Sequence, residues 1–402
     1  MSPTAAFKRL GSDAGDTGPL ACVLGDMDLV QPLGLAKIRC AVVTQPGDAP
    51  AYSRFTEQVL PWGEASGGEQ ALVEALVRFG MSQPQRPVLY FEEDAYLLMV
   101  SRYRHQLAPA FRFALADADL IETLVDKARF QALAEQLDMP VPRSRHLRPA
   151  HESQGPELDL RYPLIVKPLS RRKSWNDLGW GKALRVDGPG DLRALWPRLM
   201  SVGIDLLAQE LIPGPETRIE SYHVYIDGDG RVAGEFTGRK IRTSPADYGH
   251  STALTITDSR REAADVAALG RDLSTRMGLR GVAKFDFKRA PDGHLHLLEV
   301  NPRFNLWHHL GAVAGVNLPA LVHADLTGRP RPRAAQARPG ACWCRIRTDW
   351  RAAREAGLST ASWLGWFARC DARSVAWDDP MPFLRPRLNR LFPFTGRTGR
   401  IA

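Results

Sequence analysis

The stretch FDFKRAPDGHLHLLEVNPRF, from Phe285 to Phe304, constrains the fold more than any other part of the chain. Its two halves alternate apolar and polar residues around Asp292-Gly293, a pair that is typical of a two-residue hairpin turn. Because successive side chains of a strand point to opposite faces, the turn length fixes which residues face one another. The stretch therefore predicts an antiparallel hairpin with a defined register.

The predicted register places two acids opposite each other. Counting outward from the turn pairs Asp286 with Glu299 and Lys284 with Asn301 on one polar face. The same count makes three further pairs nearer the turn: Pro291 with His294, Ala290 with Leu295, and Lys288 with Leu297. The opposite face is an apolar row suited to a core: Phe285, Phe287, Leu298 and Val300.

Asp286 and Glu299 need a partner that offsets their repulsion. Opposed residues of a ladder have Cβ atoms about 5 Å apart, and like charges there destabilise the pair. A Mg²⁺ ion would stabilise them, because it prefers a few carboxylate or carbonyl oxygens and takes other ligands from water and phosphate. Asn301 offers one more oxygen. The alternative at this point is a solvated face on which Lys284 and Lys288 neutralise the acids.

The composition is that of a globular chain with two or three domains. Its 402 residues are 44% hydrophobic, which is enough for a large core. No apolar run approaches the ~20 residues that cross a bilayer, and the first 18 residues lack the apolar core of a secretion signal. We therefore expect a cytoplasmic location. Five cysteines without a CxxC pair indicate buried, reduced thiols.

The formal charge of +8 is concentrated near the end of the chain. After Asp379 there are five arginines and no acids, interleaved with leucines and phenylalanines. Such a tail could make a peripheral contact with anionic lipid or touch nucleic acid. We expect instead a solvated or packed tail, and no specific nucleic-acid partner. Before it, residues 329–340 (RPRPRAAQARPG) are typical of a linker.

The first 116 residues predict a small α/β domain. Apolar runs at 19–24, 40–44 and 88–91 predict strands, and the helical pattern EQALVEALVRFG lies between the last two. Strands that alternate with helices favour a parallel sheet. No GxGxxG follows the first strand, so a nicotinamide or flavin site is unsupported.

The central region brings charged residues to the ends of predicted strands. A helical apolar stripe begins at Leu120 and is expected to continue to Pro140. The strand in YPLIVKP ends at Lys167, and a lysine at the end of a buried strand needs a partner. The polar loop SRRKSWNDLGWGKALRV follows. After it we expect a strand that ends at Glu210, a Pro-Gly turn, and a second strand that begins after Glu216.

The order of these pieces resembles the ATP-grasp superfamily, in particular its carboxylate-amine ligases of the D-aspartate ligase type. DKARFQALAEQLDMPVPRS is similar to the opening helix, LIVKP to a phosphate-lysine strand, QELIPGPE to the hinge between two lobes, and FDFK with LLEVNPR to the metal-binding hairpin. The resemblance implies an α/β and α+β chain: a pre-ATP-grasp domain at 1–116, a two-lobed ATP-grasp domain at 117–328, and a linker with a Trp/Arg-rich appendage at 329–402.

The resemblance also implies roles for individual residues. For the nucleotide these are two phosphate lysines, the backbone that receives adenine and a ribose-binding acid: Lys127, Lys167, Glu210, Leu211, Ile212 and Glu216. The implied ligands of Mg²⁺, with Mn²⁺ as an alternative ion, are Asp286, Glu299 and Asn301. The implied catalytic residues are Lys284, beside the transferring phosphoryl group, and Arg303, on the acyl phosphate or the substrate carboxylate.

The implied reaction joins a small carboxylate to an amine, with an amino acid as the expected substrate. The carboxylate attacks the γ-phosphate of ATP to give an acyl phosphate, and the amine then displaces phosphate. No protein nucleophile is required, because positioning and electrostatics carry such a reaction. The oligomeric state does not follow from the sequence.

Some parts of the sequence depart from the pattern or leave alternatives open. The loop between Ser170 and Gly181 is longer and more basic than the family's short glycine-rich loop, so its phosphate contacts are undecided. Lys240 and Arg242 could meet the acceptor carboxylate or line a solvated edge. The competing functions are an idle ATP-binding module, a basic nucleic-acid binder, and a zinc enzyme using four histidines: His294, His296, His308 and His309.

Overall fold

The computed structural model divides the chain into two compact units, which we describe separately. It describes residues 18–63, 66–151, 155–169, 175, 177–333, 336–374 and 377–391. The first unit takes Met1–Ala114, Arg303–Ala335 and Ala372–Ala402, and the second takes Leu115–Pro302 and Gln336–Asp371. This division differs from the expected boundaries after 116 and 328. Residues 303–333 join the first unit because their helices α10 and α11 pack against α1.

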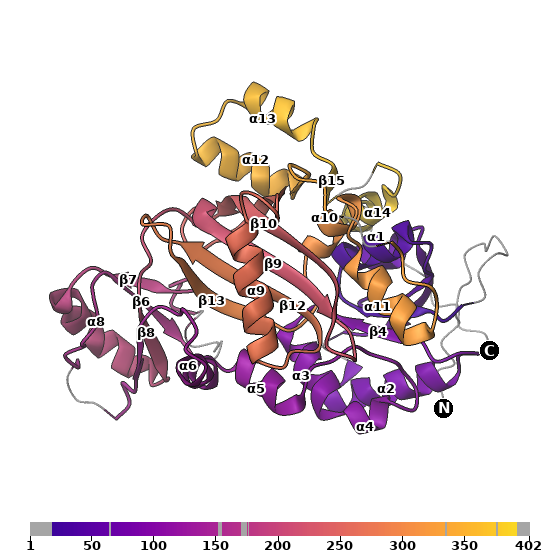
Figure 1. Cartoon of the computed structure of the whole chain (residues 1–402). Helices are drawn as coiled ribbons and strands as arrows, with labels where there is room; N and C mark the ends of the chain where they lie inside the picture. The colour runs from indigo at the N-terminus through magenta and orange to yellow at the C-terminus, as the bar shows by residue number, and fades with distance from the viewer. Residues whose placement is uncertain are drawn as a thin grey trace. The chain divides into compact units, whose positions relative to one another are not determined.

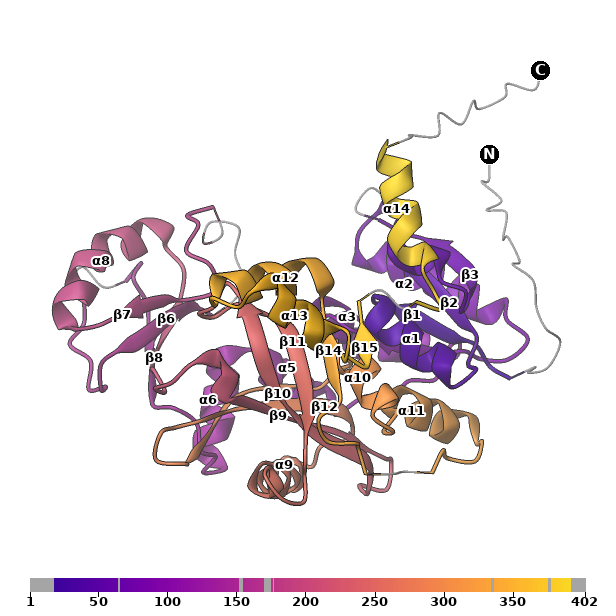
Figure 2. The same cartoon turned by 90° about the horizontal axis from the view of Figure 1, so that it is seen from above.

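The first unit is built on a parallel sheet in the strand order β3-β2-β1-β4, with β4 labelled in Figure 1 and the other three strands in Figure 2. The three strands predicted from apolar runs are confirmed, and β3 is an additional edge strand. The strands of this sheet are β1 (Ala21–Leu24), β2 (Cys40–Thr44), β3 (Thr56–Pro61) and β4 (Val88–Phe91); the two-residue β15 (Ala372–Arg373) also falls in this unit but is not part of this sheet. The helices are α1 (Met27–Leu35), η1 (Ala49–Tyr52), α2 (Glu69–Met81), α3 (Asp94–Arg102), α4 (Arg104–Leu107), α10 (Trp307–Val313), α11 (Leu318–Thr327) and α14 (Met381–Leu391).

The second unit contains a small sheet in the order β5-β8-β6-β7, in which all neighbouring strands are antiparallel. Its strands are β5 (Ser144–Leu147), β6 (Leu164–Pro168), β7 (Leu184–Val186) and β8 (Leu206–Glu210), and α8 (Pro189–Val202) packs beside β7. A core that includes Trp175 and Trp196 lies between them. This lobe carries Lys167 at the end of β6.

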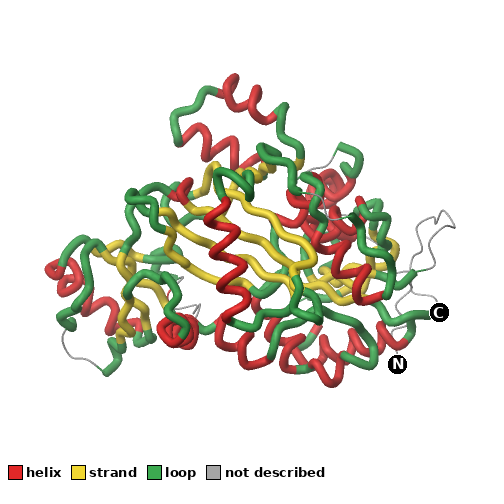
Figure 3. The backbone as a smooth tube through the Cα atoms, viewed as in Figure 1, coloured by secondary structure: helices red, strands yellow, loops and turns green. Residues whose placement is uncertain are grey.

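A larger antiparallel sheet forms the rest of the second unit, with its strands in the order β13-β12-β9-β10-β11-β14. They are β9 (Ile219–Ile226), β10 (Val232–Ser244), β11 (His250–Thr257), β12 (Gly281–Arg289), β13 (Leu295–Asn301) and β14 (Cys342–Cys344). Helix α9 (Ala264–Arg276) lies along one face against β9 and β10 (Figure 3), and the short η3 (Glu216–Arg218) precedes β9. From the C-terminal region, α12 (Ile346–Glu355) packs on β10 and β11, and α13 (Thr360–Phe367) packs on α12 (Figure 2).

The prediction of one continuous helix from Leu120 to Pro140 is wrong in its continuity. The structure breaks it into α5 (Ala118–Val125) and α6 (Lys127–Gln136). Asp126 causes the break, because its extended backbone ends α5 and its Oδ1 accepts hydrogen bonds from the amides of Ala128 and Arg129, 2.9 Å each. As a result, Lys127 is the first residue of a helix.

All five cysteines are buried and free of disulfides, as expected. Across the described residues, no individual helix has the length and apolar character to cross a membrane; α10 and α11, bent by 87°, satisfy these criteria only as a pair, by length and composition.

Candidate active site

The β12–β13 hairpin pairs Asp286 with Glu299 and Lys284 with Asn301, as predicted. The three predicted pairs nearer the turn are wrong. The structure pairs Lys288 with His296, and the loop holds three residues, closed by a 2.9 Å hydrogen bond from the Ala290 amide to the His294 carbonyl. A register shift between Asp286 and Phe287 then restores the predicted pairing at the acids.

This register shift also changes the predicted apolar face of the hairpin. Phe287 pairs with Leu297, and Leu297 is fully buried, whereas Leu298 is only partly buried. Leu298 is the extra residue of a β-bulge, which locally breaks the alternation of side chains. The prediction that Leu298 belongs to the apolar row is therefore corrected to Leu297.

Asp286 is buried and held by two neighbours. Its Oδ1 accepts a 2.5 Å hydrogen bond from Oγ of Ser221, and its Oδ2 lies 2.6 Å from Nζ of Lys284. Burial raises the pKa of this carboxyl, but the charges of Lys284 and Lys240 and the two hydrogen bonds outweigh burial and bring the pKa to about 2. Asp286 is thus an anion with a fixed position.

Glu299 has a different environment, although it faces Asp286. Its side chain is 57% exposed, and its Oε1 lies 3.8 Å from Nζ of Lys284 and accepts a 3.0 Å hydrogen bond from Nδ2 of Asn301. Lys284 therefore lies beside both carboxylates. Two carboxylates and an amide on one polar face form a donor set that fits Mg²⁺, which needs few protein ligands. Among the described residues there is no group of three or more His, Cys, Asp or Glu side chains arranged for a metal.

Lys127 and Lys167 lie together at the end of β6. Nζ of Lys127 donates to the carbonyl oxygens of Pro168 at 2.7 Å and Leu169 at 2.9 Å, and Nζ of Lys167 donates to Oε1 of Gln209 at 2.9 Å. Burial and the nearby charge of Lys127 lower the pKa of Lys167 to about 8, whereas the charge of Glu299 acts in the opposite direction. The two lysines and Glu299 are therefore close enough to interact electrostatically.

The hinge residues Glu210, Leu211 and Ile212 are partly engaged within the protein. The amide of Glu210 donates to the Arg143 carbonyl at 2.9 Å, and that of Leu211 donates to the Pro163 carbonyl at 3.0 Å. The Glu210 carboxylate accepts hydrogen bonds of 3.1 and 2.9 Å from the Arg161 guanidinium. Burial raises the pKa of Glu210, but Arg161 and Arg143 hold it below its usual range.

Glu216 begins η3 and lies between two lysines of the large sheet. Its Oε2 is 3.7 Å from Nζ of Lys240, and its Oε1 is 3.6 Å from Nζ of Lys288. All three side chains are largely buried, with exposures of 11%, 14% and 6%. Because Lys240 also acts on Asp286, Glu216 belongs to the same charged cluster as the hairpin.

Arg242, two residues after Lys240, has a structural partner instead. Its guanidinium makes a bidentate pair with the buried carboxylate of Asp349, at 2.8 and 2.7 Å, and stacks over the Trp366 ring at 4.2 Å. Asp349 also accepts from Thr252 at 2.9 Å and from the Trp363 indole at 2.8 Å. This arrangement favours neither of the two roles left open for Arg242, which were contact with the acceptor carboxylate and a place on a solvated edge. Arg242 instead anchors α12 to β10.

Arg303 lies in the first unit, whereas the hairpin residues belong to the second. Its Nε is 2.5 Å from Oδ1 of Asp94, and its Nη1 donates to the Glu92 carbonyl at 2.6 Å. Burial raises the pKa of Glu92 to about 7, against the effects of the Asp26 amide and of Arg303. The structure thus places Arg303 in an acidic neighbourhood of its own unit.

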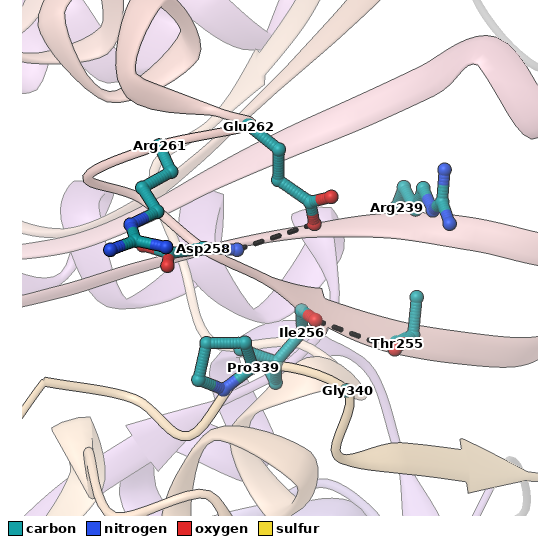
Figure 4. A pocket seen from close by; sticks show the side chains of 8 residues that line it. All are labelled: Arg239, Thr255, Ile256, Asp258, Arg261, Glu262, Pro339 and Gly340. Carbon is teal, nitrogen blue, oxygen red and sulfur yellow. Dashed lines mark hydrogen bonds between the residues drawn. The ribbon is translucent and has the colours of Figure 1, made fainter.

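Part of the expected phosphate loop, including Ser170 and Ser174, lies outside the described residues. Beyond it, Nζ of Lys182 donates to the Gly249 carbonyl at 3.4 Å, which connects the small sheet lobe with the turn between β10 and β11. A pocket elsewhere on the large sheet, lined by Arg239, Thr255 and Glu262 among others, contains none of the predicted site residues (Figure 4). We therefore do not assign the chemistry to that pocket.

Sequence reasoning missed several neighbours of the site. Ser221 contacts Asp286 because β9 pairs with β12, and Gln209 contacts Lys167 because β8 pairs with β6. Both pairings join strands from distant parts of the chain, for which the sequence has no local signal. In the alternative of a solvated face, Lys288 would neutralise the acids; the structure instead buries it beside Glu216.

Part of this chain resembles ATP-grasp proteins in sequence. Residues 205–346 match the family described as "ATP-grasp in the biosynthetic pathway with Ter operon". The structure resembles a biotin carboxylase from Campylobacter jejuni with a TM-score of 0.61 and 13% identity, covering 81% of this chain and 74% of the other. It resembles an L-amino acid ligase from Bacillus licheniformis with a TM-score of 0.59 and 16% identity, covering 83% and 79%. These likenesses confirm the expected fold.

Two proteins with similar sequences are both named as ligases. The chain is 24% identical over 240 residues to a D-aspartate ligase from Enterococcus faecium, covering 58% of this chain and 56% of that protein. It is 28% identical over 181 residues to a D-alanine–D-alanine ligase from Stutzerimonas stutzeri, covering 44% and 54%. The alignments thus span about half the length of each relative.

Proposed function

We propose that this chain is an ATP-dependent carboxylate-amine ligase that forms an amide or peptide bond and releases ADP and phosphate. The observation that carries the proposal is the charged cluster of the second unit: Asp286 faces Glu299 across a hairpin, Lys284 lies beside both, and Lys167 is within electrostatic reach of Glu299. A MgATP complex needs both the lysines and the carboxylates of this cluster, since lysines bind phosphates and carboxylates bind the cation.

In this proposal Asp286, Glu299 and Asn301 hold Mg²⁺, which would neutralise phosphate charge when it is bound; Mn²⁺ could replace it. Lys284 already lies 2.6 Å from Asp286, so it is placed to stabilise charge that develops on the transferring phosphoryl group. Asp286 keeps its place because Ser221 and Lys284 fix it.

Lys127 and Lys167 bind the phosphates in this proposal. Both now donate to protein oxygens, so they would exchange those partners for phosphate oxygens. The hinge from Glu210 to Ile212 receives adenine. Because the Glu210 and Leu211 amides donate within the protein, we assign adenine recognition to the Ile212 amide and the hinge carbonyl groups. Glu216 binds the ribose hydroxyl groups and is kept in place by its two lysines.

The reaction has two steps. An oxygen of the acid substrate attacks the γ-phosphorus, the bond to ADP breaks, and an acyl phosphate forms. The nitrogen of the amine then attacks the acyl carbon, phosphate leaves, and the amine loses a proton. Arg303 is proposed to bind the carboxylate or the acyl phosphate, for which its planar guanidinium suits two oxygens. Amino acids are the proposed substrates, since the two relatives are named for D-aspartate and D-alanine.

The test is release of phosphate from MgATP in the presence of pairs of amino acids, D and L forms included, with mass spectrometry of the products. We expect turnover to require both an acid and an amine and to yield a condensed product of matching mass. Nucleotide binding without any turnover across a broad set of pairs would favour the idle ATP-binding alternative. ATP hydrolysis that ignores both substrates would contradict the ligase proposal.

A further inference from the structure

Exposed apolar side chains of the described residues cluster at the C-terminal helix α14. Eleven large apolar side chains are exposed among all the described residues, and four of these eleven lie between Trp377 and Leu388. Their exposures are 76% for Trp377, 38% for Met381, 43% for Leu384 and 45% for Leu388. Scattered exposed apolar residues are ordinary, whereas a cluster marks a contact surface.

The start of α14 is firmly attached to the first unit. Asp379 is buried, and its carboxylate accepts hydrogen bonds from Oγ of Ser53 at 2.5 Å, from the Arg54 amide at 3.1 Å and from Nε2 of Gln31 at 3.2 Å. The neighbouring Asp378 pairs with Arg54 at 2.6 Å. The helix packs against η1, with Pro382 buried. A held helix therefore turns its other face outward.

The outward face combines an apolar stripe with flanking cations. At about 100° per residue, Met381, Leu384 and Leu388 fall within about 60° of one another on the helix surface. Arg385 lies on one side of this stripe and Arg387 on the other. Arg387 lies over the Phe383 ring at 3.3 Å and donates to the Phe383 carbonyl, which keeps its charge close to the helix.

We propose that the stripe of Met381, Leu384 and Leu388 docks this protein onto a membrane surface that contains anionic lipids. Charge complementarity supports a lipid headgroup layer, because the 23 residues after Asp379 contain five arginines and no acids. A helix with an apolar face and flanking arginines lies in the plane of such an interface, with its leucines among the acyl chains. Nucleic acid would use the arginines but would leave the leucines exposed. This inference is independent of the ligase proposal.

The experiment is sedimentation of the full chain with vesicles of phosphatidylcholine alone or with phosphatidylglycerol added. We expect binding to the anionic vesicles that weakens as salt increases. The double variant Leu384→Gln/Leu388→Gln should bind the anionic vesicles at least about tenfold more weakly, because it removes two apolar anchors. Arg385→Gln should lose about threefold to fivefold.

The matched control is Leu35→Gln/Met81→Gln, which removes two apolar side chains that are at least as exposed, 49% and 64%, elsewhere in the same unit. It should bind like the wild type, and thermal melting should show that all variants remain folded. Absence of binding to anionic vesicles, or full binding by the Leu384/Leu388 variant, would overturn the proposal. So would a dimer in sedimentation velocity that the Leu384/Leu388 variant dissociates, since a second copy would then cover the stripe.

Discussion

The β12–β13 hairpin and the end of β6 hold opposite charges in different ways. On the hairpin, Lys284, Asp286 and Glu299 lie within a short stretch of sequence and face one another through a local register. At the end of β6, the Lys127 ammonium reaches carbonyl oxygens 41 and 42 residues further along the chain. The anionic half of the site is therefore formed by local pairing, and the cationic half by packing between distant segments.

The two hairpin carboxylates also differ from each other. Asp286 is buried and each of its carboxylate oxygens has a protein partner, while the Glu299 side chain remains 57% exposed. Of the two proposed cation ligands on this face, one is therefore fixed by the fold and the other is open to solvent.

Asp286→Asn should lower the free energy of unfolding by about 3 kcal/mol, because it leaves the largely buried Lys284 ammonium without its closest anion. Thermal or urea unfolding monitored by circular dichroism measures this loss. Glu299→Gln serves as the control, since it removes the opposing charge from an exposed position. Equal stability of the two variants would show that Asp286 is no more structural than Glu299.

Glu299→Gln should reduce ATP-dependent product formation by about 100-fold or more, since it removes a charged ligand of the proposed cation. The melting temperature should stay near that of the wild type, because the exposed side chain keeps its shape. Steady-state assays with saturating MgATP measure the effect. Turnover at the wild-type rate would refute the metal role of Glu299.

Lys167→Ala should weaken nucleotide binding by about tenfold, since it removes a buried cation beside the proposed phosphates. Isothermal titration with MgADP and with a non-hydrolysable ATP analogue measures the affinity. Arg145→Ala is the matched control: it removes an exposed cation from β5 of the same sheet and should bind nucleotide normally. If both variants bind equally well, Lys167 is not a phosphate ligand.

The lowered pKa of Lys167 predicts a pH dependence. In the free protein this ammonium loses its proton near pH 8, so nucleotide affinity should fall above pH 8 by up to about tenfold per pH unit. Binding near pH 8 should take up protons, which titrations in buffers of different ionisation enthalpy detect. Lys167→Arg should remove the dependence because arginine stays charged. An unchanged dependence in that variant would assign the titration to another group.

The same shift has a defined sign for the stability of the free protein. Between pH 8 and the ordinary lysine range, the unfolded chain binds more protons at this position than the folded chain does. The Lys167 contribution to the free energy of unfolding should therefore rise with pH in that window. Comparing the pH dependence of unfolding in the wild type and in Lys167→Ala isolates the contribution of Lys167 to the free energy of unfolding.

Much of the fold was predictable wherever local signals agreed. The strands at 40–44 and 88–91, the lysine at the end of 164–168, and the pairing of the two hairpin acids all followed from apolar runs, turn residues and period-two alternation. The hairpin prediction was right at the acids although the loop is longer than predicted, because the bulge at Leu298 compensates. The break at Asp126 was missed, since an apolar stripe outweighed a capping signal inside it.

The sequence by itself determined which side chains a hairpin can present together, because strand alternation and a turn are local properties. Only the tertiary structure decided which of those charges are buried, and which distant side chains join them: Ser221 at Asp286, Gln209 at Lys167 and Asp349 at Arg242. The physical reason is that burial and long-range strand pairing depend on the packing of the whole unit. Two neighbours on β10 show it: Lys240 joins the charged cluster, and Arg242 is held by a helix that follows more than 100 residues later.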